Sequence, residues 1–392
     1  MPEADAFARR LLGWFDRHGR HDLPWQHPRT VYRLWIAEVM LQQTSVTTVL
    51  PYFERFTKTL PTLADLAAAP RDRVLALWSG LGYYTRAHHL HEAAAICMAR
   101  HSGKLPRRLS DLAALPGIGR TTAGAILAQA FGQRHPILDG NVKRVLARWH
   151  AVDGWPGASA TTRKLWDLAE RHTPRLRAAD YTQAIMDLGA LVCTRRAPRC
   201  GECPVRRGCL AKAQGRERDL PQPRPRRVVP ERDIVVVIAR SGDQRILLER
   251  RPPVGVWAGL WSLPEFPARA TAVAEFALRY HLHVAGKTCE LAPFTHAFTH
   301  FRLCVQPALV TVSEMPQGTR DNAQIAWARD EDLGALALPT PIRQLLASPA
   351  LHTESNWPDG PATYPERSHV ASGALCQARP RRGRPRLRTV AR

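Results

Sequence analysis

Residues 193–209 read CTRRAPRCGECPVRRGC and place four cysteines in a C-x6-C-x2-C-x5-C pattern, at Cys193, Cys200, Cys203 and Cys209. The residues between them are few, polar and rich in Arg and Pro, so they cannot form a hydrophobic core of their own. Thiolates are soft ligands that select zinc or iron–sulfur clusters. A zinc ribbon usually shows two C-x2-C pairs. The single pair therefore favours an iron–sulfur cluster, with a pair of disulfides as the alternative.

The residues before the cysteine run predict a mainly α-helical domain over residues 1–211. Apolar residues recur there at three- and four-residue spacing, with Pro, Gly, Ser and Thr at the breaks. Thr30 is the expected N-cap of the second helix. The expected helices are Ala4–Arg17, Val31–Gln43, Arg73–Trp78, Ala87–Arg100, Ala123–Ala130, Val142–Trp149, Arg163–Glu170 and Ala179–Leu191.

The residues after the cysteine run predict a linker and a second domain. Residues 212–232 are rich in Pro and Arg, which is typical of a linker. Residues 233–348 are expected to form an α+β domain, because they contain runs rich in β-branched residues. The expected strands are Ile234–Ala239, Ile246–Glu249 and Phe301–Val312.

The charge of the chain points to a polyanionic partner. The 392 residues carry a formal net charge of +22, and such a balance most often indicates nucleic acid. Residues 349–392 are expected to be a disordered basic tail, and 381–386 (RRGRPR) contain a core like that of an AT-hook, with a non-specific polycation as the alternative. No run approaches the ~20 apolar residues of a membrane helix, and the N-terminus is not a signal peptide. We therefore expect a cytoplasmic, nucleoid-associated protein and no membrane partner.

Residues 115–124, LPGIGRTTAG, join two expected helices. Gly117 and Gly119 allow a tight turn and expose backbone N–H groups at a helix N-terminus. This geometry favours an anion such as a DNA phosphate, and it is typical of a helix–hairpin–helix element. A plain helix–helix turn is the alternative.

Two carboxylates lie in settings that should differ. Glu38 has Leu34, Trp35 and Leu41 within one helical turn, so its pKa should be raised, which suits a general acid. An exposed surface Glu is the alternative. Asp139 precedes a helix and is expected to be its N-cap, where the helix terminus would keep it ionised. A protonated and an ionised carboxyl together are typical of enzymes that cleave glycosidic bonds.

The order of hairpin, Asp139 and cysteine run resembles the endonuclease III superfamily of DNA glycosylases. Within it, the chain resembles the MutY adenine DNA glycosylases, closely over residues 5–210 and more loosely over 233–345. The matching motifs are Glu38–Thr44 (EVMLQQT), Pro51–Phe53 (PYF), Gly80–Tyr84 (GLGYY) and Leu138–Val142 (LDGNV).

The resemblance implies an enzyme of base excision repair that removes adenine opposite 8-oxoguanine or guanine in double-stranded DNA. Glu38 would protonate the adenine, Asp139 would stabilise the cationic sugar, and Asn141 would support the site. The four cysteines of residues 193–209 would bind a 4Fe–4S cluster, with a basic loop on the DNA backbone. We also expect a monomer.

Further residues acquire roles from the same resemblance. Lyase-competent relatives carry a Lys where this chain has Thr121, so a monofunctional glycosylase is expected. The adenine must be flipped out of the duplex. The residues expected around the opposite base are Gln43, Thr44, Leu81 and Tyr83. Gln43 is expected one helical turn past Glu38, and Tyr83 is expected to project from a turn.

Residues 250–264 resemble the start of a Nudix-type fold. A Nudix hydrolase needs an acidic helix that holds Mg²⁺, but residues 265–282 contain only Glu265 and Glu275 as acids. We therefore expect a Nudix-like domain that binds 8-oxoguanine without hydrolysing phosphates. Phe298-Thr299-His300 matches the family's F-S-H loop, with Thr299 in place of Ser, so Thr299 and His300 are expected to contact 8-oxoguanine.

Two other functions remain open. A pyrimidine-specific glycosylase with lyase activity is disfavoured by Thr121 and by the second domain. A DNA-binding iron–sulfur protein or redox sensor without catalysis would not need Glu38, so it predicts that Glu38→Gln leaves function intact.

Overall fold

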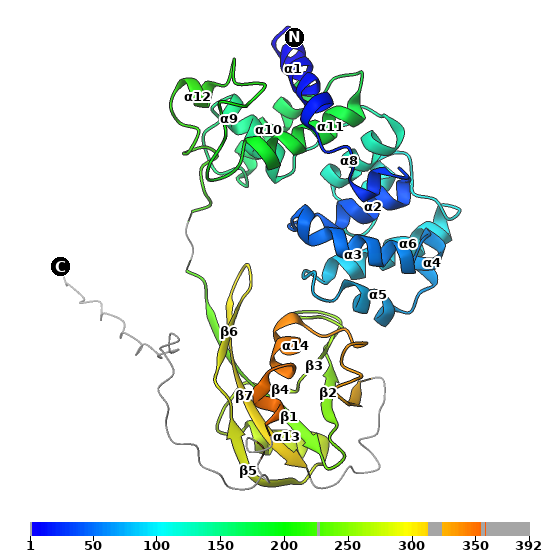
Figure 1. Cartoon of the computed structure of the whole chain (residues 1–392), viewed down its shortest axis with the longest axis vertical. Helices are drawn as coiled ribbons and strands as arrows, with labels where there is room; N and C mark the ends of the chain where they lie inside the picture. Colours follow the sequence, from blue (N-terminus) through cyan, green and yellow to red (C-terminus); the bar gives the residue numbers. More distant parts are fainter. Residues whose placement is uncertain (1, 226–227, 313–323, 354–356, 358–392) are drawn as a thin grey trace, which may run out of the picture. The chain divides into compact units, whose positions relative to one another are not determined.

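A computed structural model describes residues 2–225, 228–312, 324–353 and 357 (Figure 1). The contacts between residues divide the chain into two compact units. The first unit comprises Met1–Val228 together with Arg250–Trp261 and Asp332–Thr340, and the second comprises Val229–Glu249, Ser262–Glu331 and Pro341–Arg392. Two short stretches of the expected second domain therefore pack with the first unit.

Up to residue 213 the described part of the first unit contains helices and loops but no strand, as the apolar periodicity predicts. Its elements are α1 (Pro2–His18), a 3-10 turn (Pro24–Gln26), α2 (Val31–Met40), α3 (Val46–Thr59), α4 (Leu63–Ala68), α5 (Arg71–Trp78), α6 (Thr85–Arg100), α7 (Leu109–Ala113), α8 (Arg120–Phe131), α9 (Gly140–Trp149), α10 (Ser159–His172), α11 (Ala178–Asp187), a π-helical turn (Leu188–Val192) and α12 (Leu210–Ala213). Thr30 caps α2, because its hydroxyl accepts a hydrogen bond from the Arg33 backbone N–H at 3.2 Å. However, α2 ends at Met40, three residues before the expected end.

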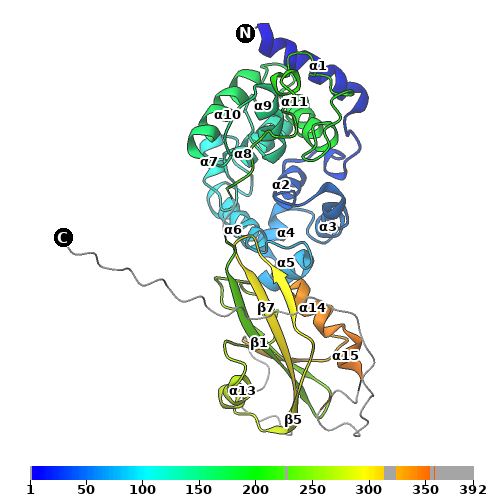
Figure 2. The ribbon, with the colours of Figure 1, turned by 90° about the vertical axis from the view of Figure 1, so that its left-hand side faces the viewer.

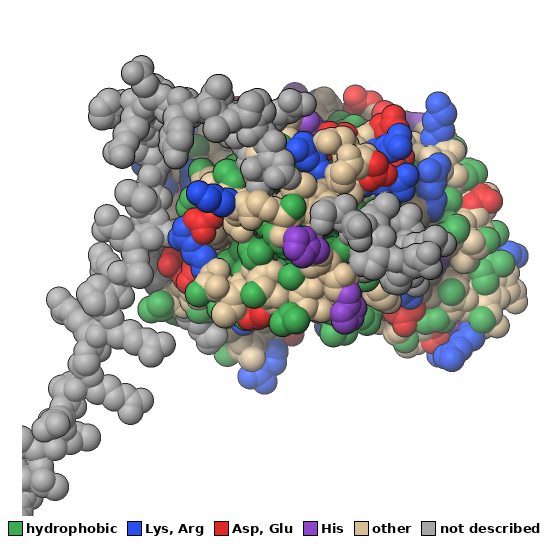
Figure 3. All heavy atoms as spheres, turned by 90° about the horizontal axis from the view of Figure 1, so that it is seen from below, with side chains coloured by type: hydrophobic (Ala, Val, Ile, Leu, Met, Phe, Trp, Pro, Cys, Tyr) green, Lys and Arg blue, Asp and Glu red, His purple; other side chains and the backbone are tan. Residues whose placement is uncertain are grey.

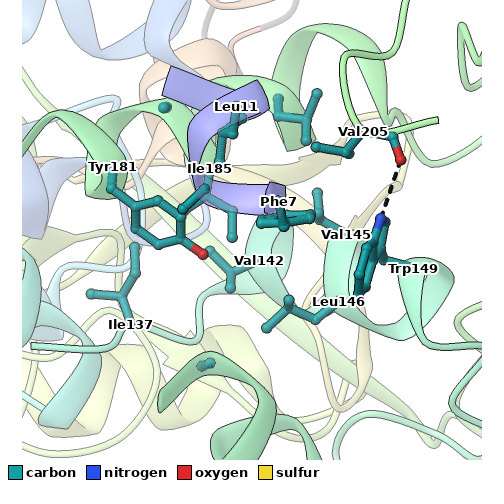
Figure 4. Packing of buried hydrophobic residues seen from close by; sticks show 14 of the residues in the cluster. Phe7, Leu11, Ile137, Val142, Val145, Leu146, Trp149, Tyr181, Ile185 and Val205 are labelled. Atoms are coloured by element: carbon teal, nitrogen blue, oxygen red, sulfur yellow. Dashed lines mark hydrogen bonds between the residues drawn. The ribbon is translucent and has the colours of Figure 1, made fainter. Parts of the chain in front are cut away.

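A hydrophobic core joins α1, α9 and α11 to the cysteine run (Figure 4). Phe7 of α1, Trp149 of α9 and Ile185 of α11 are all nearly inaccessible to solvent. The indole N–H of Trp149 donates to the Val205 carbonyl at 3.1 Å. This bond fixes the middle of the cysteine run against the helical core.

The second unit is built on one mixed sheet, which confirms the α+β class. Its strands are β1 (Glu231–Ser241), β2 (Ile246–Arg250), β3 (Trp261–Ser262), β4 (Glu265–Phe266), β5 (Val284–Glu290), β6 (Phe294–Ala297), β7 (Arg302–Val312) and β8 (Ile325–Ala328). The order is β3-β2-β1-β7-β5, with β4, β6 and β8 pairing to β1, β7 and β2. β1 and β7 run parallel and form the centre of this sheet, with Glu231 opposite Arg302 and Ser241 opposite Val312.

Helices cover both sides of this sheet. Figure 2 shows α13 (Ala272–Tyr280) on one side, and α14 (Thr340–Leu346) with α15 (Pro349–His352) on the other. Phe276 and Tyr280 of α13 are buried in the core that lies on β1 and β7. On the face at the α13 and β5 end, Lys and Arg side chains are interspersed with Asp and Glu (Figure 3). This face therefore does not form one basic surface.

Two of the expected boundaries differ from the structure. The first part of the expected linker packs on the first unit, where Leu220 is only 1% exposed and its carbonyl accepts from the Arg148 Nε–H at 2.8 Å. At the other end, α15 and the buried Trp357 lie beyond residue 348. The AT-hook-like residues 381–386 lie outside the described residues. None of the described helices is long and apolar enough to cross a membrane.

Candidate active site

A cavity of about 520 Å³ in the first unit brings together all three expected catalytic residues. Glu38 of α2, Thr121 of α8, and Asp139 and Asn141 at the start of α9 all line it, and so does Thr44. Its volume lies in the range of ~300–1,000 Å³ that is usual for small-ligand sites. Residues separated by about a hundred positions in the sequence therefore meet around one space.

Glu38 is a buried carboxyl whose ionisation is strongly perturbed by its surroundings. The pKa of Glu38 is raised to about 7, mainly by burial and to a smaller extent by the nearby charge of Asp139, while a hydrogen bond from Gln129 opposes the shift. The Gln129 side-chain amide donates to Glu38 Oε1 at 2.7 Å. The expected upward shift is confirmed. A carboxyl that titrates near neutral pH can act as a general acid.

Asp139 has a different set of partners. It is the N-cap of α9, as expected: its Oδ1 accepts from the Val142 backbone N–H at 2.8 Å. Its Oδ2 accepts from the Asn141 side-chain amide at 3.1 Å. Arg144 Nη2 donates to Asn141 Oδ1 at 2.8 Å, which holds that amide in place. Asn141 thus orients the carboxyl that it was expected to support.

The pKa of Asp139 departs from the sequence-based expectation. Burial raises it, although the hydrogen bonds from Val142 and Asn141 and the charge of Arg144 all act to lower it. The helix terminus alone therefore does not set its ionisation, because the site is also desolvated. Both oxygens of Asp139 accept N–H hydrogen bonds, whereas Glu38 accepts only one from Gln129. This difference favours ionisation of Asp139 before Glu38.

Arg86 of α6 holds the turn that follows α2, and nothing in the sequence pattern singles it out. Its guanidinium is buried, and Nη1 donates to the carbonyls of Val39, Met40 and Gln42 at 2.6–3.0 Å. Nη2 donates to the Gly82 carbonyl at 3.1 Å and to Thr44 Oγ1 at 3.2 Å. Burial lowers its pKa to about 10, so the group is cationic at neutral pH. One side chain thus joins the turn beside Glu38 to the turn that contains Tyr83.

The residues expected around the opposite base have different exposures. Tyr83 is 48% exposed with φ +50°, so it projects from its turn as predicted. Leu81 is only 5% exposed in this structure. Gln43 is exposed with φ +61° and lies in a turn, because α2 has already ended. Gln42, which was not expected, lines the cavity instead.

The hairpin before α8 has the expected tight turn. Gly117 has φ +74°, and a Cβ there would lie 2.8 Å from His89 Cβ, so only glycine fits. Gly119 is the N-cap of α8 and offers no side chain to its free N–H groups. Gln42 Nε2 donates to the Gly117 carbonyl at 3.2 Å. The hairpin is therefore connected to the cavity wall.

The four cysteines line a second cavity of about 30 Å³ in the first unit. Arg148 Nη1 donates to Cys193 Sγ at 3.3 Å. Burial raises the pKa of Cys203 to about 12, and it also raises the pKa of Cys200 and Cys209. Grouped, desolvated thiols of this kind become ligands only when a metal centre supplies positive charge.

The arrangement of the thiols bears on what this second cavity could hold. In the part of the chain that the structure describes, no group of three or more His, Cys, Asp or Glu side chains converges tightly enough for one metal ion. The four cysteines are also not joined in disulfides. Four thiols around a shared space suit a polynuclear group better than a single ion, so these residues fit an iron–sulfur cluster.

Thr299 and His300 lie in the tight turn between β6 and β7 of the second unit, and both are exposed. The Phe298 N–H donates to the Phe301 carbonyl at 2.9 Å, and the two rings stack with centroids 4.6 Å apart. This turn therefore presents Thr299 and His300 on a rigid aromatic base. Within helix α13 of this unit, Glu275 is the only acid.

Comparisons with known proteins agree with this geometry. Residues 36–171 match the family described as "HhH-GPD superfamily base excision DNA repair protein", and residues 235–348 match a NUDIX domain. An adenine DNA glycosylase of Buchnera aphidicola from Schizaphis graminum is 34% identical, covering 87% of this chain and 97% of that relative. The human adenine DNA glycosylase is 32% identical, covering 88% of this chain and 74% of its own. A solved thermostable thymine-DNA glycosylase is similar over 54% of this chain and 98% of its own, with 26% identity and a TM-score of 0.50.

Proposed function

The chain belongs to the adenine DNA glycosylase family, and on this premise we propose that it removes adenine mispaired with 8-oxoguanine or guanine in double-stranded DNA. As a member of this family it is a base excision repair enzyme that cleaves an N-glycosidic bond. The observation that carries the proposal is the pairing of Glu38, with a pKa near 7, and the hydrogen-bonded Asp139 in one cavity.

The proposed reaction is hydrolysis of the bond between C1′ of the sugar and N9 of adenine. Glu38 donates its proton to N7, and the electrons of the breaking bond move into the base. The positive charge that develops on the sugar is stabilised by ionised Asp139, which Asn141 and the Val142 N–H orient. Water adds to C1′ and gives a proton back to the Glu38 carboxylate.

Thr121 supports a monofunctional reaction. Its Oγ1 accepts from the Leu138 N–H at 3.3 Å and faces the same cavity as Glu38. A hydroxyl cannot form the Schiff base that a lyase makes with the opened sugar, because that step needs an amine. A stable adduct trapped with borohydride would contradict this proposal.

To reach the adenine, the enzyme must flip it out of the duplex, and protein side chains must fill the space that it leaves in the base stack. The exposed Tyr83 and Gln43 are proposed to enter the base stack, together with Thr44 and Leu81. Gly117 and Gly119 are proposed to bind a phosphate through the N–H groups at the start of α8. In the second unit, Thr299 and His300 are proposed to contact 8-oxoguanine.

Cys193, Cys200, Cys203 and Cys209 are proposed to hold a 4Fe–4S cluster. When bound, it would supply the positive charge that keeps these thiolates ionised, and its role would be structural. The loop of residues 195–207 would then be fixed against the core through the Trp149 bond to Val205. We propose that the protein acts as a monomer on DNA in the cytoplasm.

The test uses duplexes with one adenine opposite 8-oxoguanine, guanine or thymine, followed by alkali to cut the abasic strand. We expect cleavage after alkali for the first two duplexes and none for the third. Cleavage without alkali would favour the lyase, and no base release would favour the non-catalytic protein.

Matched variants test the second unit. Thr299→Ala and His300→Ala should weaken the preference for 8-oxoguanine over guanine more than they slow adenine release. The control Thr288→Ala removes another exposed hydroxyl, from β5. It should change neither the preference for 8-oxoguanine nor the rate of adenine release. Equal losses on both mispairs would contradict the assigned role.

A further inference from the structure

A cavity of about 750 Å³ lies in the first unit beside the two cavities described above. Its walls come from the first turns of α9, from residues 155–157, from the cysteine run, and from residues 218–224 of the expected linker. We call it the linker groove. Arg195 and Arg196 belong to the basic loop that the resemblance places on the DNA backbone, whereas no residue of the linker wall was predicted as a site residue.

The linker wall of this groove is anchored to the helical unit at several points. Leu220 is buried, and its carbonyl accepts from Arg148 Nε at 2.8 Å. Gln222 Oε1 accepts from the Gly154 N–H at 3.0 Å. The guanidinium of Arg224 lies 5.2 Å from the centre of the Trp155 ring, and Arg216 pairs with Asp153. A segment that only tethered two domains would not need these contacts.

The groove is strongly basic. Its charged lining residues are Lys143, Arg144, Arg195, Arg196, Arg218 and Arg224, with a single acid, Asp219. Arg144 is engaged with Asn141 and with the backbone. Within the described residues, the side chains of Lys143, Arg195, Arg196 and Arg218 have no hydrogen bond or ion pair. Unneutralised cations gathered in one groove, with an aromatic wall, are typical of a nucleic-acid backbone site.

The position of the groove decides which part of the nucleic acid would occupy it. Asp139 and Asn141 line the active-site cavity, whereas Gly140 and Lys143 line the groove. The start of α9 is therefore the shared wall of the two spaces. A nucleotide whose sugar lies beside Asp139 is covalently joined to phosphates on both sides. Because the two spaces share this wall, the groove is the adjacent basic space that a phosphate on one side of that nucleotide can occupy.

We propose that the linker groove binds backbone phosphates of the strand that carries the flipped adenine, and that Arg218 and Arg224 contact them. This inference rests on the proposed function. It assigns residues 218–224 to the DNA-binding surface of the helical unit. The groove holds the strand in register, and it takes no part in the bond cleavage.

The experiment uses the full chain and a duplex with 2′-fluoro-2′-deoxyadenosine opposite 8-oxoguanine. The fluorine disfavours the cationic sugar, so binding can be measured without cleavage. The variant Arg218→Gln/Arg224→Gln removes two cations from the groove. The control Arg73→Gln/Arg100→Gln removes two exposed cations from α5 and α6. Arg218→Lys/Arg224→Lys keeps the charge and tests rescue.

We expect the groove variant to weaken binding about tenfold at physiological salt and to reduce the slope of log Kd against log salt by about 2. The control should stay within about twofold of the wild type, and the Lys variant should recover most of the affinity. The single-turnover rate of adenine release at saturating protein should not change. A groove variant that binds like the control would overturn the proposal.

Neutral methylphosphonate linkages identify the strand. Placed beside the adenine, they should weaken binding by the wild type but have no further effect on the groove variant. Placed on the opposite strand, they should affect both proteins equally. If linkages on the opposite strand weakened binding by the wild type but not by the groove variant, the strand assignment would be wrong. If the groove bound an acidic peptide but not DNA, the proposed ligand would be wrong. If the wild type releases adenine, the proposed function holds whatever the outcome of the groove experiments. If it releases none, the proposed function itself has failed.

Discussion

The active-site cavity and the cysteine-lined cavity share two stretches of chain in their walls, yet their side chains behave differently. The start of α9 faces the first cavity, and Val145, Arg148 and Trp149 farther along it face the second. In the π-helical turn after α11, Leu191 faces the first and Val192 the second. One scaffold therefore serves both spaces.

The difference lies in what burial does to each set of ionisable groups. In the active-site cavity, burial leaves Glu38 with a pKa near 7, where a proton can be given and taken back. In the cysteine cavity, burial makes the thiols harder to ionise, so they need a metal centre. Damage to the first cavity should therefore change the rate of reaction, and damage to the second should change folding and binding.

The largest expected effect comes from the cysteine cavity. Cys203→Ser replaces one of the four soft thiol ligands with a hard hydroxyl, so the cluster should be lost. Because metal binding contributes to folding free energy, DNA binding and the cooperative melting of the helical unit should be lost together. Iron content, melting temperature and Kd for DNA measure this. The control Cys289→Ser in β5 should leave iron content, melting temperature and Kd unchanged. Full activity in a protein without iron would contradict a structural role for the cysteine cavity.

Glu38→Gln should give the next largest effect. The amide keeps the size of the side chain and can still accept the hydrogen bond from Gln129, but it has no acidic proton to transfer to the base. We expect the single-turnover rate to fall by about 10²–10⁴-fold, with unchanged Kd for DNA. The control Glu54→Gln changes an exposed acid on α3 and should be silent. If Glu38→Gln weakened DNA binding and left the single-turnover rate unchanged, the two cavities would not differ in the way described above.

Asp139→Asn should cost less than Glu38→Gln. The new side chain can still accept from the Val142 N–H, so the cap of α9 is kept, but the charge facing the sugar is lost. We expect the rate of adenine release to fall by about 10²–10³-fold, measured under single turnover. An unchanged melting temperature would show that the cap survived. A rate within twofold of the wild type would show that a group other than Asp139 stabilises the cationic sugar.

The smallest effect is on stability. Folding raises the pKa of Glu38 to about 7, so the folded state binds a proton that the unfolded state releases above pH 4.5. Stability from this group is fully present below pH 4.5 and is lost as the pH rises through about 7. Glu38→Gln should therefore stabilise the protein at pH 8 by about 3 kcal/mol and have little effect at pH 4. Urea unfolding at the two pH values measures this, and equal effects at both would contradict the shift.

Local patterns in the sequence predicted the parts of the site that depend on nearby residues. The caps at Thr30 and Asp139 are set by hydrogen bonds to residues three positions away. The raised pKa of Glu38 follows from apolar neighbours on its own helix. The helical periodicity located α1, α6 and α9 to within a few residues.

Contacts between distant residues could not be read from the sequence. Gln129 meets Glu38 across 91 positions, and Arg86 reaches back 44 to 47 positions to the turn after α2. The end of α2 at Met40 was missed for the same reason, since the carbonyls that follow are bound by Arg86. One sequence signal could have shown that the linker packs on the first unit: Leu220 is a lone apolar residue in a stretch of Arg, Pro and polar residues.

The bonds of Arg86 have an evolutionary consequence. One guanidinium holds both the turn that carries Tyr83 and the turn beside Glu38. A substitution at this position would disturb both turns at the same time. Variation that changes one turn and leaves the other intact is therefore expected within the turns themselves and not at residue 86.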